Sequence, residues 1–223
     1  MIDLIETTSD ILVLAAHPDD ETLGMGGTIH KLARKGVNVH LLTFTDGESA
    51  RREKRINRRA KLSDVVDVLG IAKYVSLNFD DNAMDSVPLL EICCAIEDNL
   101  QFFEVGFTVV FTHHAECLNI DHKILHQAAL TVFRPFKKTT ILSYYVPSSS
   151  DYSTTITHPN FFVPLDEEDL QAKMDAASLY NSEMRDSPHS RSYANLIYRA
   201  QMNGSIVGEK YAEGFRFERG VIA

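Results

Sequence analysis

The stretch Ile11–Glu21 reads ILVLAAHPDDE and decides the fold. Its first six residues, Ile11–Ala16, are all apolar, which is typical of a strand buried on both faces of a sheet. A histidine, a proline and three acidic residues follow immediately. In open α/β sheets the ligand crevice lies beyond the carboxyl ends of the strands, so the sequence places a candidate site directly after this strand.

Apolar runs alternate with helical patterns up to residue 146, as in a parallel sheet whose strands are joined by helices. The predicted strands are Ile11–Ala16, Val37–Thr45, Tyr74–Asn78, Phe107–Thr112 and Thr140–Val146. The predicted helices between them are Gly24–Lys35, Glu53–Leu69, Leu89–Phe103 and Asp121–Phe133. We therefore expect an α/β fold with a mostly parallel sheet.

The alternation ends at residue 146. Pro147–Pro159 is rich in serine and threonine, and a loop of this length in a compact domain is usually functional or mobile. Beyond it we predict an extended segment at Phe161–Pro164, helices at Asp166–Tyr180 and Ser190–Asn203, and a mixed apolar and charged tail at Tyr211–Arg219. Because no linker divides the chain, we expect a single domain over residues 1–223, with residues 147–223 as a substrate loop and C-terminal elaboration.

The chain of 223 residues carries 22 lysines and arginines against 31 aspartates and glutamates, a formal net charge of −9. An acidic chain binds the phosphate backbone poorly, so we expect no nucleic-acid partner. No apolar run reaches the ~20 residues that span a bilayer, and the acidic N-terminus lacks the basic region of a signal peptide. We expect a cytoplasmic protein in which Cys93, Cys94 and Cys117 are reduced core thiols. The sequence does not decide the oligomeric state, and a homo-oligomer is one of the alternatives.

The acidic run after the first strand is the strongest chemical signal. Asp19, Asp20 and Glu21 place like charges side by side, which costs free energy unless a cation neutralises them. A divalent metal ion would do so. The alternative is that Asp19 or Asp20 only caps the following helix.

A second polar cluster follows the fourth predicted strand, at the same edge of the sheet. It contains His113, His114, Asp121 and His122. Two histidines and one aspartate with an open fourth position are a common catalytic zinc pattern. The spacing alone does not decide which of these three histidines completes the set.

Three segments of the chain resemble one protein family. Ala16–Glu21 followed by Gly24–Gly27 is similar to the signature of the PIG-L/LmbE-like zinc-dependent N-deacetylases. Thr45–Glu48 resembles the second segment of that family, and Asn119–His122 resembles the third. The resemblance implies a Rossmann-like, three-layer αβα fold. It also implies a zinc-dependent hydrolase that removes an N-acetyl group from an amino sugar or a glycoconjugate, releasing acetate and a free amine.

The resemblance also implies roles for single residues. His17, Asp20 and His122 would bind Zn²⁺, for which other divalent transition metals can substitute, and Asp19 would be the general base. Some family members carry a histidine where this chain has Asn119, and an asparagine cannot deliver a proton near neutral pH. The proton would then return through Asp19, His113 or His114. Asn119 itself either donates to the substrate or only shapes the turn.

Further residues are candidates for binding the substrate or supporting the ligands. Arg58 is the arginine that the family resemblance favours, whereas the neighbouring arginines are interpreted as a solvated helix face. Asp46 fits a sugar hydroxyl or a turn. His189 and Arg191 fit a phosphate or nucleotide on the substrate, or a surface loop. The remaining candidates of this kind are Asp121 and His113.

Two other functions compete with this hypothesis. The segment Gly24–Gly27 suggests a nucleotide-binding oxidoreductase, but the dinucleotide motif G-x-G-x-x-G requires glycine where this chain has Ile29. The second alternative is a non-catalytic sugar- or nucleotide-binding module that keeps the Rossmann-like fold. Zinc content together with acetate release would discriminate among the three.

Overall fold

The structure is a computed structural model, and it describes residues 8–47, 58–155 and 158–220. Its strands are β1 (Asp10–Ala15), β2 (Asn38–Thr45), β3 (Lys73–Phe79), β4 (Val109–His113), β5 (Thr140–Tyr144), β6 (Phe161–Leu165) and β7 (Tyr211–Arg219). Its α-helices are α2 (Asp20–Arg34), α3 (Arg59–Leu69), α4 (Leu89–Phe103), α5 (Ile120–Val132), α6 (Glu167–Leu179) and α7 (Tyr193–Val207). Short 3-10 turns lie at Met84–Ser86 and Pro135–Lys137.

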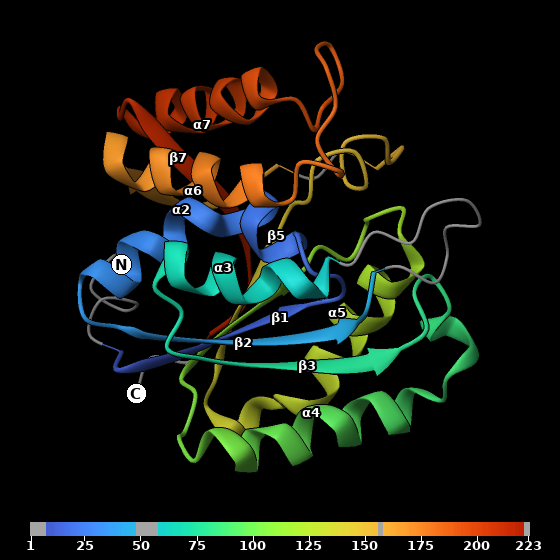
Figure 1. The fold of residues 1–223 in the computed structure, drawn as a ribbon. Coiled ribbons are helices and arrows are strands. Elements are labelled where there is room, and N and C mark those ends of the chain that lie inside the picture. The colour runs from blue at the N-terminus through green and yellow to red at the C-terminus, as the bar shows by residue number, and fades with distance from the viewer. Residues whose placement is uncertain (1–7, 48–57, 156–157, 221–223) are drawn as a thin grey trace.

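The strands form one seven-stranded sheet in the order β3-β2-β1-β4-β5-β7-β6 (Figure 1). The first five strands are parallel to their neighbours, and β7 is antiparallel to both β5 and β6. The predicted α/β fold with a mostly parallel sheet is therefore confirmed. The carboxyl ends of β1 and β4, where the two polar clusters follow, lie side by side because Ile11 pairs with Val109.

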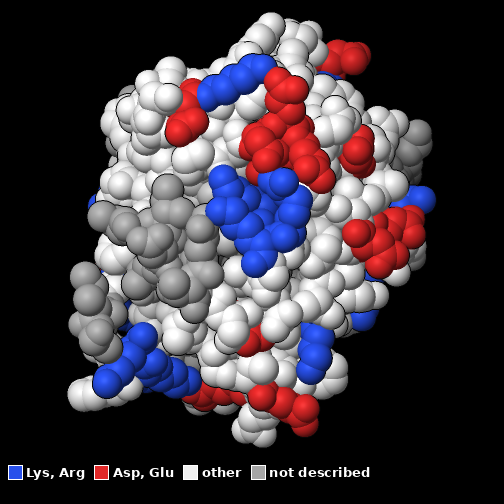
Figure 2. Space-filling model, turned by 90° about the vertical axis from the view of Figure 1, so that its left-hand side faces the viewer, with Lys and Arg blue, Asp and Glu red and all other residues white. Residues whose placement is uncertain are grey.

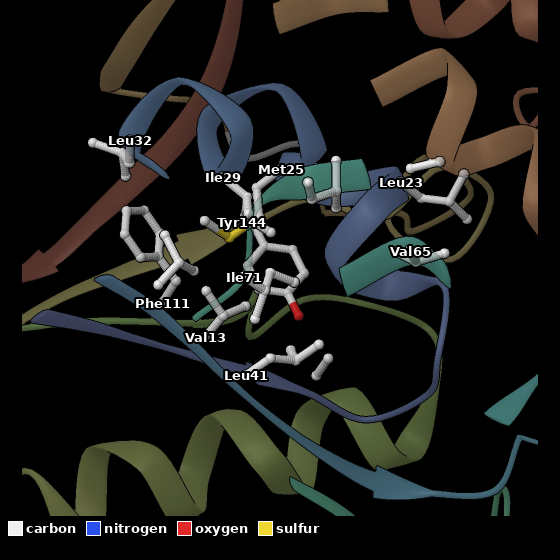
Figure 3. Close-up of a cluster of buried hydrophobic side chains, with 14 of the residues drawn as sticks. Val13, Leu23, Met25, Ile29, Leu32, Leu41, Val65, Ile71, Phe111 and Tyr144 are labelled. Carbon is white, nitrogen blue, oxygen red and sulfur yellow. The ribbon is translucent and has the colours of Figure 1, made fainter. Parts of the chain in front are cut away.

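Helices cover both faces of the sheet. In β1, Ile11 and Val13 belong to the hydrophobic cluster under α2 and α3, while Leu12 and Leu14 belong to the cluster over α4 and α5. Figure 3 shows the first of these clusters between the sheet and α2. All four side chains are fully buried. Since burying one such side chain contributes about 1.5–3 kcal/mol, this strand is held firmly from both sides.

Helix α2 is kinked at Met25, where φ is −151° and ψ is 23°. The kink frees backbone groups, and two buried side chains from the C-terminal part of the chain bind them. Lys173 Nζ donates to the Leu23 carbonyl at 3.0 Å, and the Glu213 carboxylate accepts the Gly27 and Thr28 N–H groups at 3.2 and 2.6 Å. Lys173 and Glu213 also contact each other at 2.5 Å. Thus α6 and β7 fix the angle at which the first turn of α2 meets β1.

The glycines of this helix serve close packing. A Cβ atom on Gly24 would lie 2.3 Å from the ring of Tyr144, and one on Gly27 would lie 2.5 Å from the side chain of Leu165. The structure therefore explains the segment Gly24–Gly27 through contacts with β5 and β6.

Several predicted boundaries need correction. Helix α2 begins at Asp20 rather than Gly24, because Asp20–Leu23 already form its first turn. Helix α7 begins after its cap, Ser192, and continues to Val207. The tail at Tyr211–Arg219 is a strand inside the sheet. The predicted start of the helix Glu53–Leu69 and the arginines at 51, 52 and 55 lie outside the described residues.

Charged side chains of both signs lie together on the surface. On the side of the molecule away from the strand carboxyl ends, acidic and basic side chains lie next to each other (Figure 2). Ion pairs of this kind join α2 to α6, where Arg34 contacts Asp166 and, at 3.1 Å, Glu168. Within the described ranges, none of the helices has both the length and the apolar character needed to cross a bilayer.

The three cysteines are free thiols. Cys93 and Cys117 are buried as predicted, but Cys94 is exposed, so the expectation of three core thiols is wrong for Cys94. Cys94 follows Cys93 on α4, and neighbouring helical residues point in different directions.

Candidate active site

The turn between β1 and α2 has an unusual backbone. Asp19 has a φ of 130°, a region that residues other than glycine rarely adopt. The turn is closed by hydrogen bonds from the His17 N–H to Asp20 Oδ2 at 2.9 Å and from the Asp19 N–H to Glu21 Oε2 at 3.1 Å. Burial raises the pKa of Glu21 to about 7, and the hydroxyl of Tyr180 donates to this carboxyl at 3.2 Å. Strain of this kind is typical of functional sites.

Three donor atoms from the two polar clusters meet beside this turn. His17 Nδ1 lies 3.0 Å from Asp20 Oδ2 and 3.2 Å from His122 Nε2, and the latter two atoms are 3.1 Å apart. All three side chains are buried. Although burial opposes protonation, the Asp20 carboxylate raises the pKa of His122 to about 9.

The donor set fits a zinc ion. Zinc binds histidine nitrogen and carboxylate oxygen at about 2.0–2.2 Å, so tetrahedral ligand atoms stand about 3.3–3.6 Å apart. The three observed separations of 3.0–3.2 Å need only a small outward shift to match. Two imidazoles and one carboxylate are also a usual catalytic zinc set.

The other ring nitrogen of His17 faces two carboxylates. Its Nε2 lies 3.0 Å from both Asp81 Oδ1 and Asp121 Oδ2. Asp121 is itself held by the backbone N–H groups of Asn82, at 2.7 Å, and Met84, at 3.0 Å. Carboxylates in this position orient a histidine that binds metal through its opposite nitrogen. The group His17, Asp81 and Asp121 could also surround an ion, but it would compete with the first set for His17.

Asp19 is held by two arginines. Its Oδ2 accepts from Arg58 at 3.1 Å and from Arg191 at 3.3 Å. Its Oδ1 is buried and has no hydrogen-bond partner among the described residues, which points to a water or a ligand atom there. Burial raises the pKa of Asp19, and the two arginines oppose that rise. Glu183 lies on the other side of the arginines, 3.4 Å from Arg191 and 3.7 Å from Arg58.

These groups surround a cleft of about 100 Å³. It is lined by His17, Asp19, Arg58, Asp81, Asn82, Asn119, His122, Glu183 and Arg191. Asp81, Asn82 and Glu183 are missing from the residues predicted as candidates. For Asp81 and Asn82 the signal was present, because both follow the third strand at the same edge of the sheet. Glu183 sits in an irregular segment after α6, where the chain resembles the C-terminal features of the family only weakly.

Asn119 caps helix α5. Its Oδ1 accepts from the N–H groups of Asp121 at 2.9 Å and His122 at 3.4 Å, and its Nδ2 donates to Asn82 Oδ1 at 2.9 Å. The turn-forming interpretation therefore describes what its side chain does in this structure.

Other candidates lie apart from the cleft lining that the structure describes. His113 Nε2 accepts the Ala16 N–H at 2.8 Å, and its ring stacks on His122. Burial, with His122 adding to the effect, holds the pKa of His113 well below its usual value. His114 lines a separate cavity beside α7, and the half-buried Asp46 and His189 lie outside the lining. The prediction that His113 or His114 returns a proton finds no support in these positions.

Comparison with known proteins identifies the family. Residues 12–133, more than half of the chain, match the family model described as PIG-L: GlcNAc-PI de-N-acetylase. The chain belongs to the PIG-L family. The matched part includes the three donor residues, Asp19 and Arg58, whereas Glu183 and Arg191 lie beyond it.

Relatives of this PIG-L chain include named deacetylases. The uncharacterized deacetylase YaiS of Escherichia coli (strain K12) is 29% identical over 176 residues, which cover 77% of this chain and 90% of that protein. Diacetylchitobiose deacetylase of Thermococcus kodakarensis is 25% identical over 95% of this chain and 84% of that protein. The solved structure of N,N'-diacetylchitobiose deacetylase from Pyrococcus horikoshii has the same fold, with a TM-score of 0.77 at 22% identity over 97% of this chain and 86% of that one.

Proposed function

We propose that this chain is a metal-dependent hydrolase that removes the N-acetyl group of an amino sugar or glycoconjugate, producing acetate and a free amine. One observation carries the proposal. Three atoms that could hold a metal ion stand 3.0–3.2 Å apart, and in the same cleft a buried carboxylate, Asp19, has an oxygen without a partner among the described residues. Membership of the PIG-L family and the names of two chitobiose deacetylases support the choice of an N-acetylated sugar.

His17, Asp20 and His122 would hold the ion, which we propose to be Zn²⁺. A zinc ion bound there supplies Lewis acidity, which polarises an amide carbonyl and makes water a nucleophile near neutral pH. Asp81 and Asp121 keep the ring of His17 oriented through its Nε2.

Asp19 is proposed as the general base. Arg58 and Arg191 occupy its Oδ2, so the lone pairs of Oδ1 are left to accept the proton of the attacking water. Its burial raises its pKa and so makes it a stronger base than an exposed aspartate. Since Asn119 cannot deliver a proton and His113 and His114 do not line the cleft, Asp19 would also pass the proton to the departing amine.

The charge of the cleft bears on the kind of substrate that binds there. Both arginines in the lining are already paired with carboxylates, Arg58 with Asp19 and Arg191 with Asp19 and Glu183. We therefore propose a substrate without a phosphate at this position. The cytoplasmic location and the single-domain boundaries remain predictions.

Acetate release tests the proposal. Purified, zinc-loaded protein should release acetate from at least one member of a panel of N-acetylated mono- and disaccharides, sugar nucleotides and glycosides. The His122→Ala variant should retain no zinc and should release no acetate. A zinc-containing wild-type protein that binds a panel sugar but releases no acetate would instead support the non-catalytic binding module.

A further inference from the structure

The two ring nitrogens of His122 have different surroundings. Its Nε2 faces His17 and Asp20 in the donor set. Its Nδ1 lies 3.1 Å from Cys117 Sγ. The sulfur therefore occupies the place where a metal-binding histidine usually meets a carboxylate, a backbone carbonyl or water.

The sulfur of Cys117 is held in place. The Cys117 side chain is fully buried, and the Asn119 backbone N–H and the Ser150 side chain also hydrogen-bond to it. The backbone on either side is fixed as well, because the Cys117 N–H donates to the His114 carbonyl at 3.3 Å and the Leu118 N–H donates to the Ser149 carbonyl at 2.8 Å. With donors directed at it, the sulfur acts as a hydrogen-bond acceptor.

We propose that Cys117 is a positioning residue for His122, whose Nδ1–H donates to its sulfur so that the Nε2 lone pair points at the metal. The inference rests on the proposed function, because it assigns Nε2 to an ion. A neutral imidazole carries one N–H, so an acceptor at Nδ1 selects the tautomer that leaves Nε2 free to bind. His17 is oriented by the carboxylates of Asp81 and Asp121. Thus carboxylates orient the ring of His17, whereas a sulfur atom orients the ring of His122.

Cys117 is not itself a ligand in this arrangement. Its sulfur contacts the nitrogen on the far side of the His122 ring from Asp20. The groups of described residues whose atoms could surround one ion do not include it.

Metal affinity of three variants tests the proposal. Cys117→Ala removes the acceptor, Cys117→Ser keeps a smaller one, and Cys93→Ala is the matched control. Cys93 is a buried thiol on α4 that contacts the carbonyl of Ala128, and within the described residues it has no hydrogen bond to His17, Asp20 or His122. Zinc dissociation constants would be measured by competition with a chromophoric chelator, and thermal unfolding of the metal-free proteins would report on folding.

Loss of an orienting partner typically weakens metal binding by about 10–100-fold, and we expect a loss of this size for Cys117→Ala. Cys117→Ser should stay within about threefold of wild type, and Cys93→Ala should match it. Wild-type affinity in Cys117→Ala, or equal losses in Cys117→Ala and Cys117→Ser, would overturn the proposal. A thiolate-to-metal charge-transfer band in the cobalt-substituted wild type would also overturn it, because it would make Cys117 a ligand.

The outcome is separable from that of the proposed function, because affinity is measured without substrate. A protein that shows these affinities but releases no acetate would refute the deacetylase proposal alone. Normal affinity in Cys117→Ala, with acetate still released by the wild type, would refute the role of Cys117 alone.

Discussion

The parallel half of the chain, residues 10–144, and the part that follows it contribute to the cleft in different ways. The first supplies the three atoms that could hold a metal ion, together with Asp19, from the carboxyl ends of neighbouring strands. The second supplies Arg191 and Glu183 beside Asp19, and Lys173 and Glu213 beneath α2. The comparison indicates that the candidate reacting groups follow the parallel strands. The later segments instead set the angle of the first turn of α2 and the charges around Asp19.

The largest expected effect is that of Asp19→Asn, which tests whether the chemistry belongs to the parallel half. The amide keeps the size of the side chain but cannot accept the proton of water, and general-base catalysis is worth about 10²–10⁴-fold. We expect kcat to fall by that factor while zinc content, measured by elemental analysis, stays at the wild-type level. Turnover close to wild type in the zinc-loaded variant would remove Asp19 from the base role.

Lys173→Met tests whether the later segments hold the first in place. Removing one partner of a buried ion pair costs about 3–5 kcal/mol, and Lys173 and Glu213 are both buried. We expect a loss of that size in the free energy of unfolding, measured with urea. Lys210→Met is the matched control, because Lys210 pairs with Glu167 at the exposed surface, where such pairs contribute about 0–1 kcal/mol. Equal losses in the two variants would contradict the supporting role of the buried pair.

Arg191→Gln tests whether the later half reaches the chemistry itself. One of the two guanidinium groups on Asp19 would be lost, and we expect a decrease of about tenfold in kcat/KM, the size of one charge-assisted hydrogen bond. Because Arg191 lowers the pKa of Asp19, its removal raises that pKa. A base works above its pKa, so the acidic limb of the kcat/KM profile should move to higher pH.

The control for this shift is Arg185→Gln, which removes the same charge from an exposed side chain that donates to the carbonyls of Ser182 and Met184. An identical displacement of the acidic limb in both variants would mean that overall charge, and not contact with Asp19, sets the pKa.

The smallest effect on catalysis is expected for Asn119→Ala. This variant tests whether every cleft residue from the parallel half contributes to turnover. Asn119 caps α5, and loss of such a cap costs about 0.5–2 kcal/mol of stability. Turnover per folded molecule should remain nearly unchanged. Asp166→Ala removes the side-chain cap of α6, which does not belong to the cleft lining, and should cost a similar amount. A clear fall in kcat that is confined to Asn119→Ala would show that its amide contacts the substrate.

The sequence predicts the parallel half well because its signals are local. β1 and β4 carry apolar runs, and His17, Asp20 and His122 lie in the segments that follow these two strands, which the topology brings together. Arg58 was selected through the family resemblance, and it does contact Asp19. Their roles as ligands and substrate contacts remain proposals.

The helices after residue 146 were predicted, but the positions of the buried charged side chains in this part were not, because they depend on partners far away in sequence. Glu213 interrupts an otherwise ordinary strand pattern, since acidic residues are depleted in strands. It is buried there because the kink in α2, more than 180 residues earlier, exposes two N–H groups that need an acceptor. Glu183 is likewise placed by Arg58 and Arg191 rather than by its neighbours.

The position of β7 also sets an order of events during synthesis. Among the described strands it comes last in sequence, yet it lies between β5 and β6 in the sheet. A growing chain can therefore pair its five parallel strands early, whereas β6 has no neighbour until residues 211–219 have left the ribosome. Domains generally fold as units as they emerge, so the segment that carries Glu213 arrives after the parallel strands. The first turn of α2 would reach its final angle only after residues 211–219 have emerged, which delays completion of the cleft until then.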